Sequence, residues 1–130
     1  MSYKELLPIY RKWYPKENNY KKVVPRDLEL TPEHILHWFM DDGYSCFRNR
    51  HTATRVQKKQ VIVCFCSESF TKEDQMFLIE QMDRKFGIKS SVRKTKGGTG
   101  WRIFVHQSCA DHFFEVIGPC PVPSMQYKWK

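Results

Sequence analysis

Two adjacent carboxylates followed by a glycine form the part of this sequence best suited to chemistry. Asp41, Asp42 and Gly43 close an apolar segment that begins at Thr31 and Pro32. A threonine at the N-cap and a proline behind it predict a helix over this segment, with the glycine as its stop. Acids at a helix C-terminus are unfavourable, because the dipole and the unpaired carbonyls are already negative there. A divalent cation would reverse that cost, since Mg²⁺ prefers carboxylate and carbonyl oxygens. Spacing alone leaves open the simpler interpretation that both acids are only solvated.

The helix that carries these acids is apolar on more than one side. Ile35, Trp38 and Phe39 form one stripe at helical spacing, and Leu36 and Met40 form another. One sheet can bury only one stripe, so the second stripe needs another partner.

The rest of the chain is predicted to build a mixed fold around this helix. Residues 1–30 are a lead-in with a short helix and a charged linker, and residues 31–130 form the main domain. Four strands are expected, at Tyr44 to about Thr54, Gln60–Ser67, Ile88–Thr95 and Trp101–His106, with a turn at Val56–Lys59 between the first two. Two further helices are expected, one from a Thr71–Asp74 capping box to Gly87 and one that Ser108 caps and that runs to Ile117. The tail from Cys120 is expected to be extended. This α-β-β-α-β-β-α order predicts an α+β fold, with an antiparallel four-stranded sheet whose helices cover one face.

The composition favours a globular domain with a polyanionic partner. The chain has 130 residues, of which 22 are Lys or Arg and 14 are Asp or Glu, and its formal net charge is +8. No apolar run approaches the roughly 20 residues of a membrane span. Five cysteines without secreted-domain spacing indicate reduced thiols. We therefore expect an intracellular protein without a secretory signal that binds nucleic acid rather than membrane, in an organelle, a nucleus or a prokaryotic cytoplasm.

The segment from Ile35 to Gly43, ILHWFMDDG, resembles the nine-residue motif of the LAGLIDADG homing endonucleases. The predicted element order is similar to one unit of that fold. Three further stretches, Ser69–Thr71, Lys85–Gly87 and Pro123–Lys128, are similar to its yeast-mitochondrial-type branch. The resemblance covers roughly residues 20–130.

The resemblance implies a site-specific double-stranded DNA endonuclease. Two motif helices would pack together and join their acids around Mg²⁺, with Ca²⁺ or Mn²⁺ as substitutes. Asp42 would supply the metal-binding carboxylate, Asp41 its backbone carbonyl, and Lys128 the active-site ammonium. Glu68 falls near the place of a polar residue that organises water, although relatives often carry an amide there. The alternative is a non-cleaving RNA maturase or DNA-binding module of the same ancestry.

Alternation along the strands places basic side chains on the uncovered face of the sheet, where arginine can recognise guanine edges. The residues expected to contact DNA there are Arg48, Arg50, Thr52, Lys89, Ser91, Arg93, Thr95 and Arg102. Lys58, Lys59 and Lys96 are expected at turns, where they would contact phosphates.

A single motif implies two units per active site. Leu36, His37 and Met40 are expected at the interface between the motif helices. Relatives usually carry small residues at motif positions two and three, so Leu36 and His37 forbid the closest approach. A homodimer on a pseudopalindromic target and one half of a two-unit enzyme both remain open.

Overall fold

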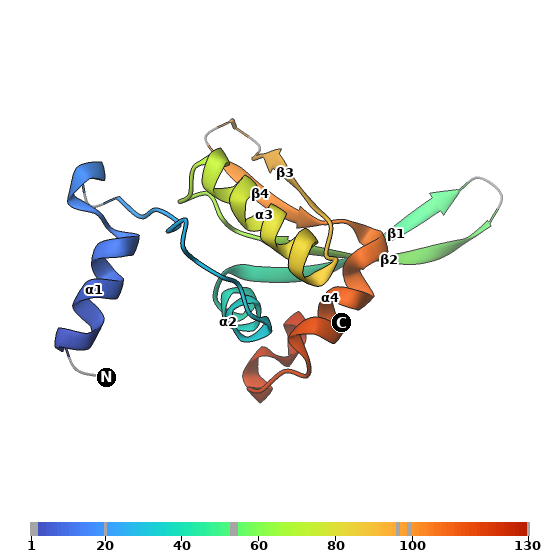
Figure 1. Cartoon of the computed structure of the whole chain (residues 1–130). Coiled ribbons are helices and arrows are strands. Elements are labelled where there is room, and N and C mark those ends of the chain that lie inside the picture. The colour runs from blue at the N-terminus through green and yellow to red at the C-terminus, as the bar shows by residue number, and fades with distance from the viewer. Residues whose placement is uncertain (1–2, 20, 53–54, 96, 99, 130) are drawn as a thin grey trace.

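The computed structural model describes residues 3–19, 21–52, 55–95, 97–98 and 100–129, without the side chains of Tyr3 and residues 46–60. Its elements are α1 (Tyr3–Trp13), α2 (Pro32–Asp42), β1 (Gly43–Thr52), β2 (Arg55–Phe65), α3 (Lys72–Phe86), β3 (Ser90–Lys94), β4 (Trp101–Val105) and α4 (Ala110–Ile117) (Figure 1). Short 3₁₀ helices occupy Lys16–Asn18, Gln107–Cys109 and Pro123–Lys128. No helix among the described residues is long and apolar enough to cross a bilayer.

The four strands form one antiparallel sheet in the order β1-β2-β4-β3. Val63 lies opposite Val105 and Phe65 opposite Ile103, and all four side chains are buried. Because opposite residues share a face, this face of the sheet is the core face. Helices α2, α3 and α4 lie on one side of the sheet in Figure 1. The predicted α+β class, element order and one-sided layering are confirmed.

Aromatic rings fix α2 against the sheet and the C-terminal segment. Phe39 is fully buried and meets Phe65, Phe113 and Trp129 edge-on, with ring centroids 5.9, 5.2 and 5.3 Å away. Edge-to-face pairs add to the gain from burying apolar area. The motif helix is therefore held by the sheet, by α4 and by the tail together.

The second part of the lead-in is held against α3 by buried polar side chains. Asp74 accepts a hydrogen bond from the Val24 amide at 3.1 Å. Gln81 accepts one from the Leu30 amide at 2.8 Å and donates one to the Leu28 carbonyl. Val24 and Leu30 are both part of the hydrophobic core. The division of the chain into a lead-in and a main domain at residue 30 stays a prediction. The boundary has residues of the hydrophobic core on both sides.

The hairpin turn is not where the sequence pattern placed it. Strand β2 begins at Arg55, and Lys58 and Lys59 lie within it, opposite Arg50 and Asn49. A turn was expected at Val56–Lys59, but pairing with β1 extends the ladder past these residues. The expectation that Lys58 and Lys59 sit at a turn was wrong.

Three predictions about helix ends and the tail also need correction. Thr71 caps α3 through the Asp74 amide, but the Asp74 carboxylate reaches the lead-in rather than completing a capping box. Ser108 does not cap α4, which begins after a 3₁₀ turn with Cys109 at its N-cap. The tail is not extended, because Pro123–Lys128 forms a 3₁₀ helix.

Candidate active site and nucleic-acid interface

The motif helix passes directly into the first strand, since α2 ends at Asp42 and β1 begins at Gly43. Gly43 has φ −90° and ψ 158°, an extended conformation open to any residue. A methyl group there would lie 2.2 Å from Phe39 Cδ1 and 2.7 Å from the Phe39 carbonyl oxygen. The sequence predicted a helix stop at Gly43. The structure shows why this residue is a glycine, because any side chain there would collide with Phe39.

A lysine from the tail occupies the C-terminal end of α2. The Lys128 ammonium donates a hydrogen bond to the Met40 carbonyl at 2.5 Å, and Ser45 donates one to the Lys128 carbonyl, also at 2.5 Å. A cation at this end of a helix interacts favourably with its dipole. From the sequence we expected a metal ion to offset the negative charge at the C-terminal end of this helix. The structure shows that Lys128 also supplies positive charge there.

The two motif acids lie in different surroundings. Asp41 is exposed, whereas Asp42 is half-buried and its carbonyl accepts the Cys66 amide at 2.8 Å. Both residues line a cavity of about 450 Å³ on the flank of α2, together with His34 and His37. The backbone of Asp42 is therefore held both by the α2–β1 junction and by the residue that follows β2.

Glu68 and Arg102 form an ion pair close to this end of the sheet. Glu68 was expected to organise water and Arg102 to contact DNA, each separately, and the structure brings the two side chains together. Gly100 packs against Glu68, because a methyl group at Gly100 would lie 3.1 Å from Glu68 Cβ. The Arg102 guanidinium is therefore paired with the Glu68 carboxylate, while Arg102 itself lies at a strand position on the outer face of the sheet.

A buried glutamine that the sequence pattern did not single out holds the Glu68 loop. The Gln75 amide nitrogen lies 3.0 Å from the Ser67 carbonyl, 3.1 Å from the Phe70 carbonyl and 3.0 Å from the Trp101 carbonyl. Its carbonyl oxygen accepts a hydrogen bond from the Ser67 hydroxyl. Gln75 is fully buried on the apolar face of an amphipathic helix. A polar residue at such a position is the one feature of the sequence that could have indicated its structural role.

Tyr44 begins the outer face of the sheet beside the motif acids. Its hydrogen bond with Cys64 and its partial burial raise the pKa of Tyr44 to about 12, and the nearby Arg102 opposes this shift. The phenol is therefore neutral at physiological pH and can donate a hydrogen bond.

The register shows which strand positions share this outer face. Tyr44 lies opposite Cys64, Cys64 opposite Phe104, and Phe104 opposite Ser91. Arg93 pairs with Arg102 and is exposed. The Arg93 guanidinium also lies 4.9 Å from the centre of the Phe104 ring.

The distal hairpin continues the same face. Arg48 lies opposite Gln60 and Arg50 opposite Lys58, both in phase with Tyr44, whereas Lys59 is out of phase. The ladder shifts between Arg50 and Thr52, so the two-residue count that placed Thr52 on this face is broken there. The side chains of all these hairpin residues lie outside the described part of the structure.

The remaining predicted DNA contacts have mixed surroundings. Lys89 is exposed just before β3. The Thr95 hydroxyl donates to the Gly100 carbonyl at 3.3 Å, so it serves the β3–β4 turn. Lys96 lies outside the described residues.

The residues predicted for the motif-helix interface differ in their surroundings, and Leu36 packs against the hydrophobic core. His37 is exposed, and Leu36 and Met40 are half-buried. The sequence grouped Trp38 with the core stripe. Trp38 is half-buried and stacks on Phe65 with ring centroids 4.0 Å apart.

Comparison with known proteins places this arrangement in a family. The profile of the LAGLIDADG DNA endonuclease family matches residues 1–113. The chain belongs to this family. The profile includes α1 and the linker, so the family resemblance begins earlier than the motif itself.

Relatives of this LAGLIDADG chain include maturases and endonucleases. It is 29% identical over 126 residues to the cytochrome b mRNA maturase bI2 of Saccharomyces cerevisiae, covering 92% of this chain and 27% of that protein. It is 28% identical to the probable intron-encoded endonuclease 1 of Wickerhamomyces canadensis, covering 85% of this chain and 46% of that protein. The chain thus spans less than half the length of these two relatives.

A solved structure agrees with this LAGLIDADG fold. The homing endonuclease I-WcaI bound to its DNA recognition sequence superimposes with a TM-score of 0.70 at 26% identity. The match covers 86% of this chain and 47% of that one, which means that one such unit corresponds to about half of I-WcaI.

Proposed function

We propose that this chain is one unit of a site-specific, metal-dependent endonuclease that cleaves double-stranded DNA. The observation that carries the proposal is the α2–β1 junction, where Asp42 ends the motif helix and Gly43 begins the strand that leads into the outer face of the sheet. A second unit, as a second copy or as the other half of a longer chain, would contribute the matching acid.

The residues at the junction suit a hard divalent cation. The Asp42 carboxylate and the Asp41 carbonyl are oxygen ligands of the kind that Mg²⁺ or Ca²⁺ accepts. Within the part of one unit that the structure describes, no three His, Cys, Asp or Glu side chains gather around one point. The second unit and the DNA phosphate are expected to complete the coordination shell. When bound, the metal would activate water and neutralise charge on the phosphate.

The surrounding residues take the roles that their positions allow. Lys128 holds a positive charge beside the acids and would stabilise the charge that develops on the phosphate. Glu68 would order water or position Arg102, because the two side chains are already paired. The neutral Tyr44 phenol lies on the DNA-facing side and can donate to a phosphate or base.

The outer sheet face would contact DNA. The residues proposed for this role are Arg48, Arg50, Thr52, Lys58, Lys59, Lys89, Ser91, Arg93, Thr95, Lys96 and Arg102, with Lys59 and Thr52 as the weakest candidates after the register is taken into account. Contacts from this many cations predict affinity that falls steeply with salt, because counterions are released from the DNA. Arg48→Ala should relax base preference at one position of each half-site, at a cost of roughly 1–3 kcal/mol.

The decisive experiment is cleavage of a randomised target library with and without Mg²⁺. We expect wild-type cleavage only with metal, and no cleavage by Asp42→Asn, which should still bind the selected target. The matched control is Asp83→Asn, which removes an exposed acid from the last turn of α3 and should cleave normally. Cleavage at the wild-type rate by a folded Asp42→Asn protein would show that Asp42 is not the metal-binding carboxylate.

A second function is favoured by the relatives themselves, since the bI2 proteins are named as maturases. In that case the chain would bind a folded intron RNA without needing the metal site. A splicing assay with Asp42→Asn separates the two, because a maturase role survives this substitution and an endonuclease role does not.

A further inference from the structure

The Glu68–Arg102 ion pair joins two chain segments that lie just beyond the end of a strand ladder. The pairing of β2 with β4 ends with Phe65 opposite Ile103. Glu68 follows Phe65 in the segment after β2, and Arg102 immediately precedes Ile103 in β4. Because the ladder has ended at this point, the geometry of the ion pair depends on what else joins the two segments.

The Gln75 side chain of α3 bridges the two segments. Two residues beyond the last ladder pair, the segments reach Ser67 and Trp101. The Gln75 amide nitrogen lies 3.0 Å from the carbonyl oxygen of each of these residues. It also lies 3.1 Å from the Phe70 carbonyl oxygen, so it contacts both ends of the loop that carries Glu68. The two N–H donors of the amide are therefore shared among three carbonyl groups.

A glutamine suits this place because its amide offers donors and an acceptor together. While its nitrogen faces three carbonyls, its oxygen accepts the Ser67 hydroxyl at 2.7 Å. Gln75 and Ser67 are 0% and 1% exposed, so bulk water does not reach these groups. A carboxylate of the same shape would place an anion against three carbonyl oxygens, and an apolar side chain would remove the donors that these carbonyls use.

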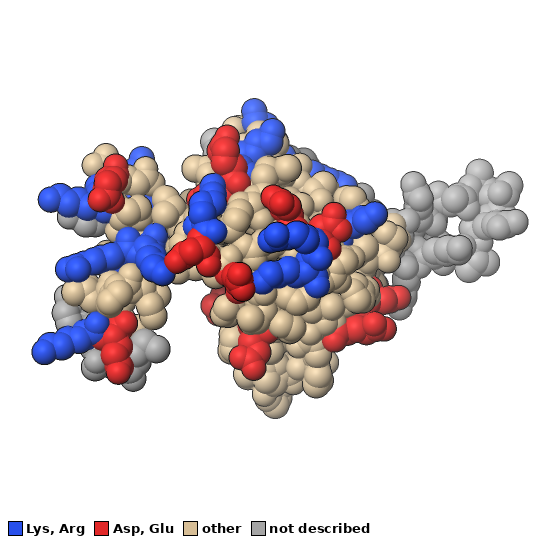
Figure 2. All heavy atoms as spheres, in the orientation of Figure 1, with Lys and Arg blue, Asp and Glu red and all other residues tan. Residues whose placement is uncertain are grey.

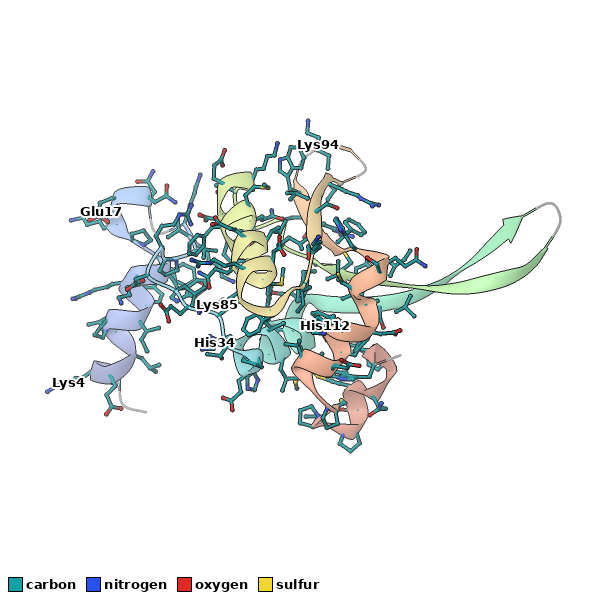
Figure 3. The ribbon with its side chains drawn as sticks, turned by 45° about the vertical axis from the view of Figure 1, so that its right-hand side comes forward. Lys4, Glu17, His34, Lys85, Lys94 and His112 are labelled. Atoms are coloured by element: carbon teal, nitrogen blue, oxygen red, sulfur yellow. The ribbon has the colours of Figure 1, made fainter. Side chains whose placement is uncertain are left out.

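The elements around this bridge converge at one end of the sheet. The ammonium groups of Lys72 and Lys94 lie 4.5 and 5.7 Å from the centre of the Trp101 ring. The start of α3, the end of β3 and the start of β4 therefore meet there. In Figure 3, Lys94 lies at this end, and Lys85 lies at the opposite end of α3.

Gln75 does not act on a ligand through the surface of its own helix. Figure 2 shows the side of the molecule that α3 covers, where acidic and basic side chains are interspersed. Gln75 lies fully buried beneath this surface. Its influence on a ligand therefore passes through the Glu68–Arg102 pair, because Arg102 occupies a strand position on the outer face of the sheet.

We infer that Gln75 is a positioning residue for the proposed DNA-contacting face. By holding the Glu68 loop against the start of β4, it keeps the Glu68 carboxylate on the Arg102 guanidinium and so limits how far Arg102 can reach towards a phosphate. Gln75 itself touches no substrate and acts through Glu68. The inference rests on the proposed binding of DNA by the outer face and names a residue that controls it.

The first measurement needs no DNA. The Arg102 Nε–H donates to Glu68, so nuclear magnetic resonance should show this proton protected from exchange with water, in a signal identified by its loss in Arg102→Lys. Gln75→Met has a side chain of similar length but lacks the amide. We expect it to speed this exchange about tenfold or more, towards the rate in Glu68→Gln, because the loop opens more often.

Gln81→Met is the matched control for this measurement. Gln81 is also a buried glutamine of α3, at 3% exposed, but its amide binds the backbone of Leu28 and Leu30 in the lead-in. It should lower stability in urea denaturation as Gln75→Met does. The exchange of the Arg102 Nε–H should stay within about twofold of the wild-type rate, because the two sites are independent.

The second measurement is the salt dependence of DNA binding, followed by fluorescence anisotropy. Gln75→Met should steepen the slope of log Kd against log salt concentration by about 0.9, which corresponds to one further phosphate contact. The double variant Gln75→Met/Glu68→Gln should have the same slope as Glu68→Gln alone, because both substitutions release the same arginine. A loss of stability alone would not produce this dependence on Glu68.

Ser67→Ala is the second variant, and it decides the question if Gln75→Met does not fold. It removes the hydroxyl that the Gln75 oxygen accepts and should speed the Arg102 exchange in the same direction by a smaller factor. Unchanged exchange in the folded variant, an equal effect of Gln81→Met, or slopes that add in the double variant would overturn the inference.

The two measurements keep this inference separate from the proposed function. A wild type that binds no DNA would refute the proposed function, and the exchange rates would still show whether Gln75 holds the ion pair. Faster exchange with an unchanged salt slope would leave DNA binding standing and refute the control of Arg102 by Gln75.

Discussion

Replacing Lys128 with methionine should destabilise the fold and disturb the proposed active site. The Lys128 ammonium lies 2.5 Å from the Met40 carbonyl, at a helix end that also carries Asp41 and Asp42. A hydrogen bond from a charged group contributes about 1.5–3 kcal/mol, and a favourable charge at a helix end about 0.3–1 kcal/mol. The site is half-buried, so solvent screens part of this energy. We expect a loss of about 1–2 kcal/mol in the free energy of unfolding.

Urea denaturation followed by tryptophan fluorescence measures this loss. Mg²⁺ should restore part of the stability of Lys128→Met, because a cation at Asp42 replaces the missing positive charge. Lys85→Met is the matched control. Lys85 also donates to a backbone carbonyl, that of Leu30, but at 3.3 Å and away from the motif acids. If Lys128→Met costs no more than Lys85→Met, or if Mg²⁺ affects the two variants equally, the assigned role of Lys128 is wrong.

Three further outcomes can be checked on the purified protein. Gly43→Ala should destabilise the fold by about 3 kcal/mol or more in urea denaturation, because the new methyl group overlaps the preceding turn of α2, and a loss below about 1 kcal/mol would contradict the packing argument. Glu68→Gln should release Arg102 and steepen the salt dependence of DNA binding, and an unchanged slope in a fluorescence-anisotropy titration would show that Arg102 does not reach phosphate. Cys64→Ala should lower the pKa of Tyr44 from about 12 towards its ordinary value in a spectrophotometric alkaline titration. Because folding raises this pKa, the stability it contributes is complete below about pH 10 and is lost as the pH rises through 12. An unchanged titration would mean that Cys64 is not the cause.

The sequence was sufficient where structure depends on neighbouring residues. The helix from Pro32 to Asp42 was predicted with its Thr31 cap, because cap, proline and glycine stop act within one or two turns. The two hairpins also followed, since each joins consecutive segments, whereas the pairing of β2 with β4 that joins them was not predicted.

The sequence was insufficient where structure depends on residues far apart in the chain. The Lys128–Met40 contact spans 88 positions and the Glu68–Arg102 pair spans 34. Nothing in local spacing indicates either of them. The β1–β2 turn was misplaced because pairing with β1 carries the ladder past Lys59 and Lys58 towards the tip of the hairpin.

The direct passage from α2 into β1 has a consequence for how the binding specificity of such a chain can change. With no loop between Asp42 and Gly43, the strand and the helix share one continuous backbone. If the outer face binds DNA as proposed, substitutions along the strand can alter which bases are recognised without moving Asp42. A single inserted residue at the junction would instead turn every following side chain of β1 to the other face of the sheet. Under the proposed function, point substitutions would therefore give access to new target sequences, whereas a change in chain length at this junction would abolish recognition and core packing together.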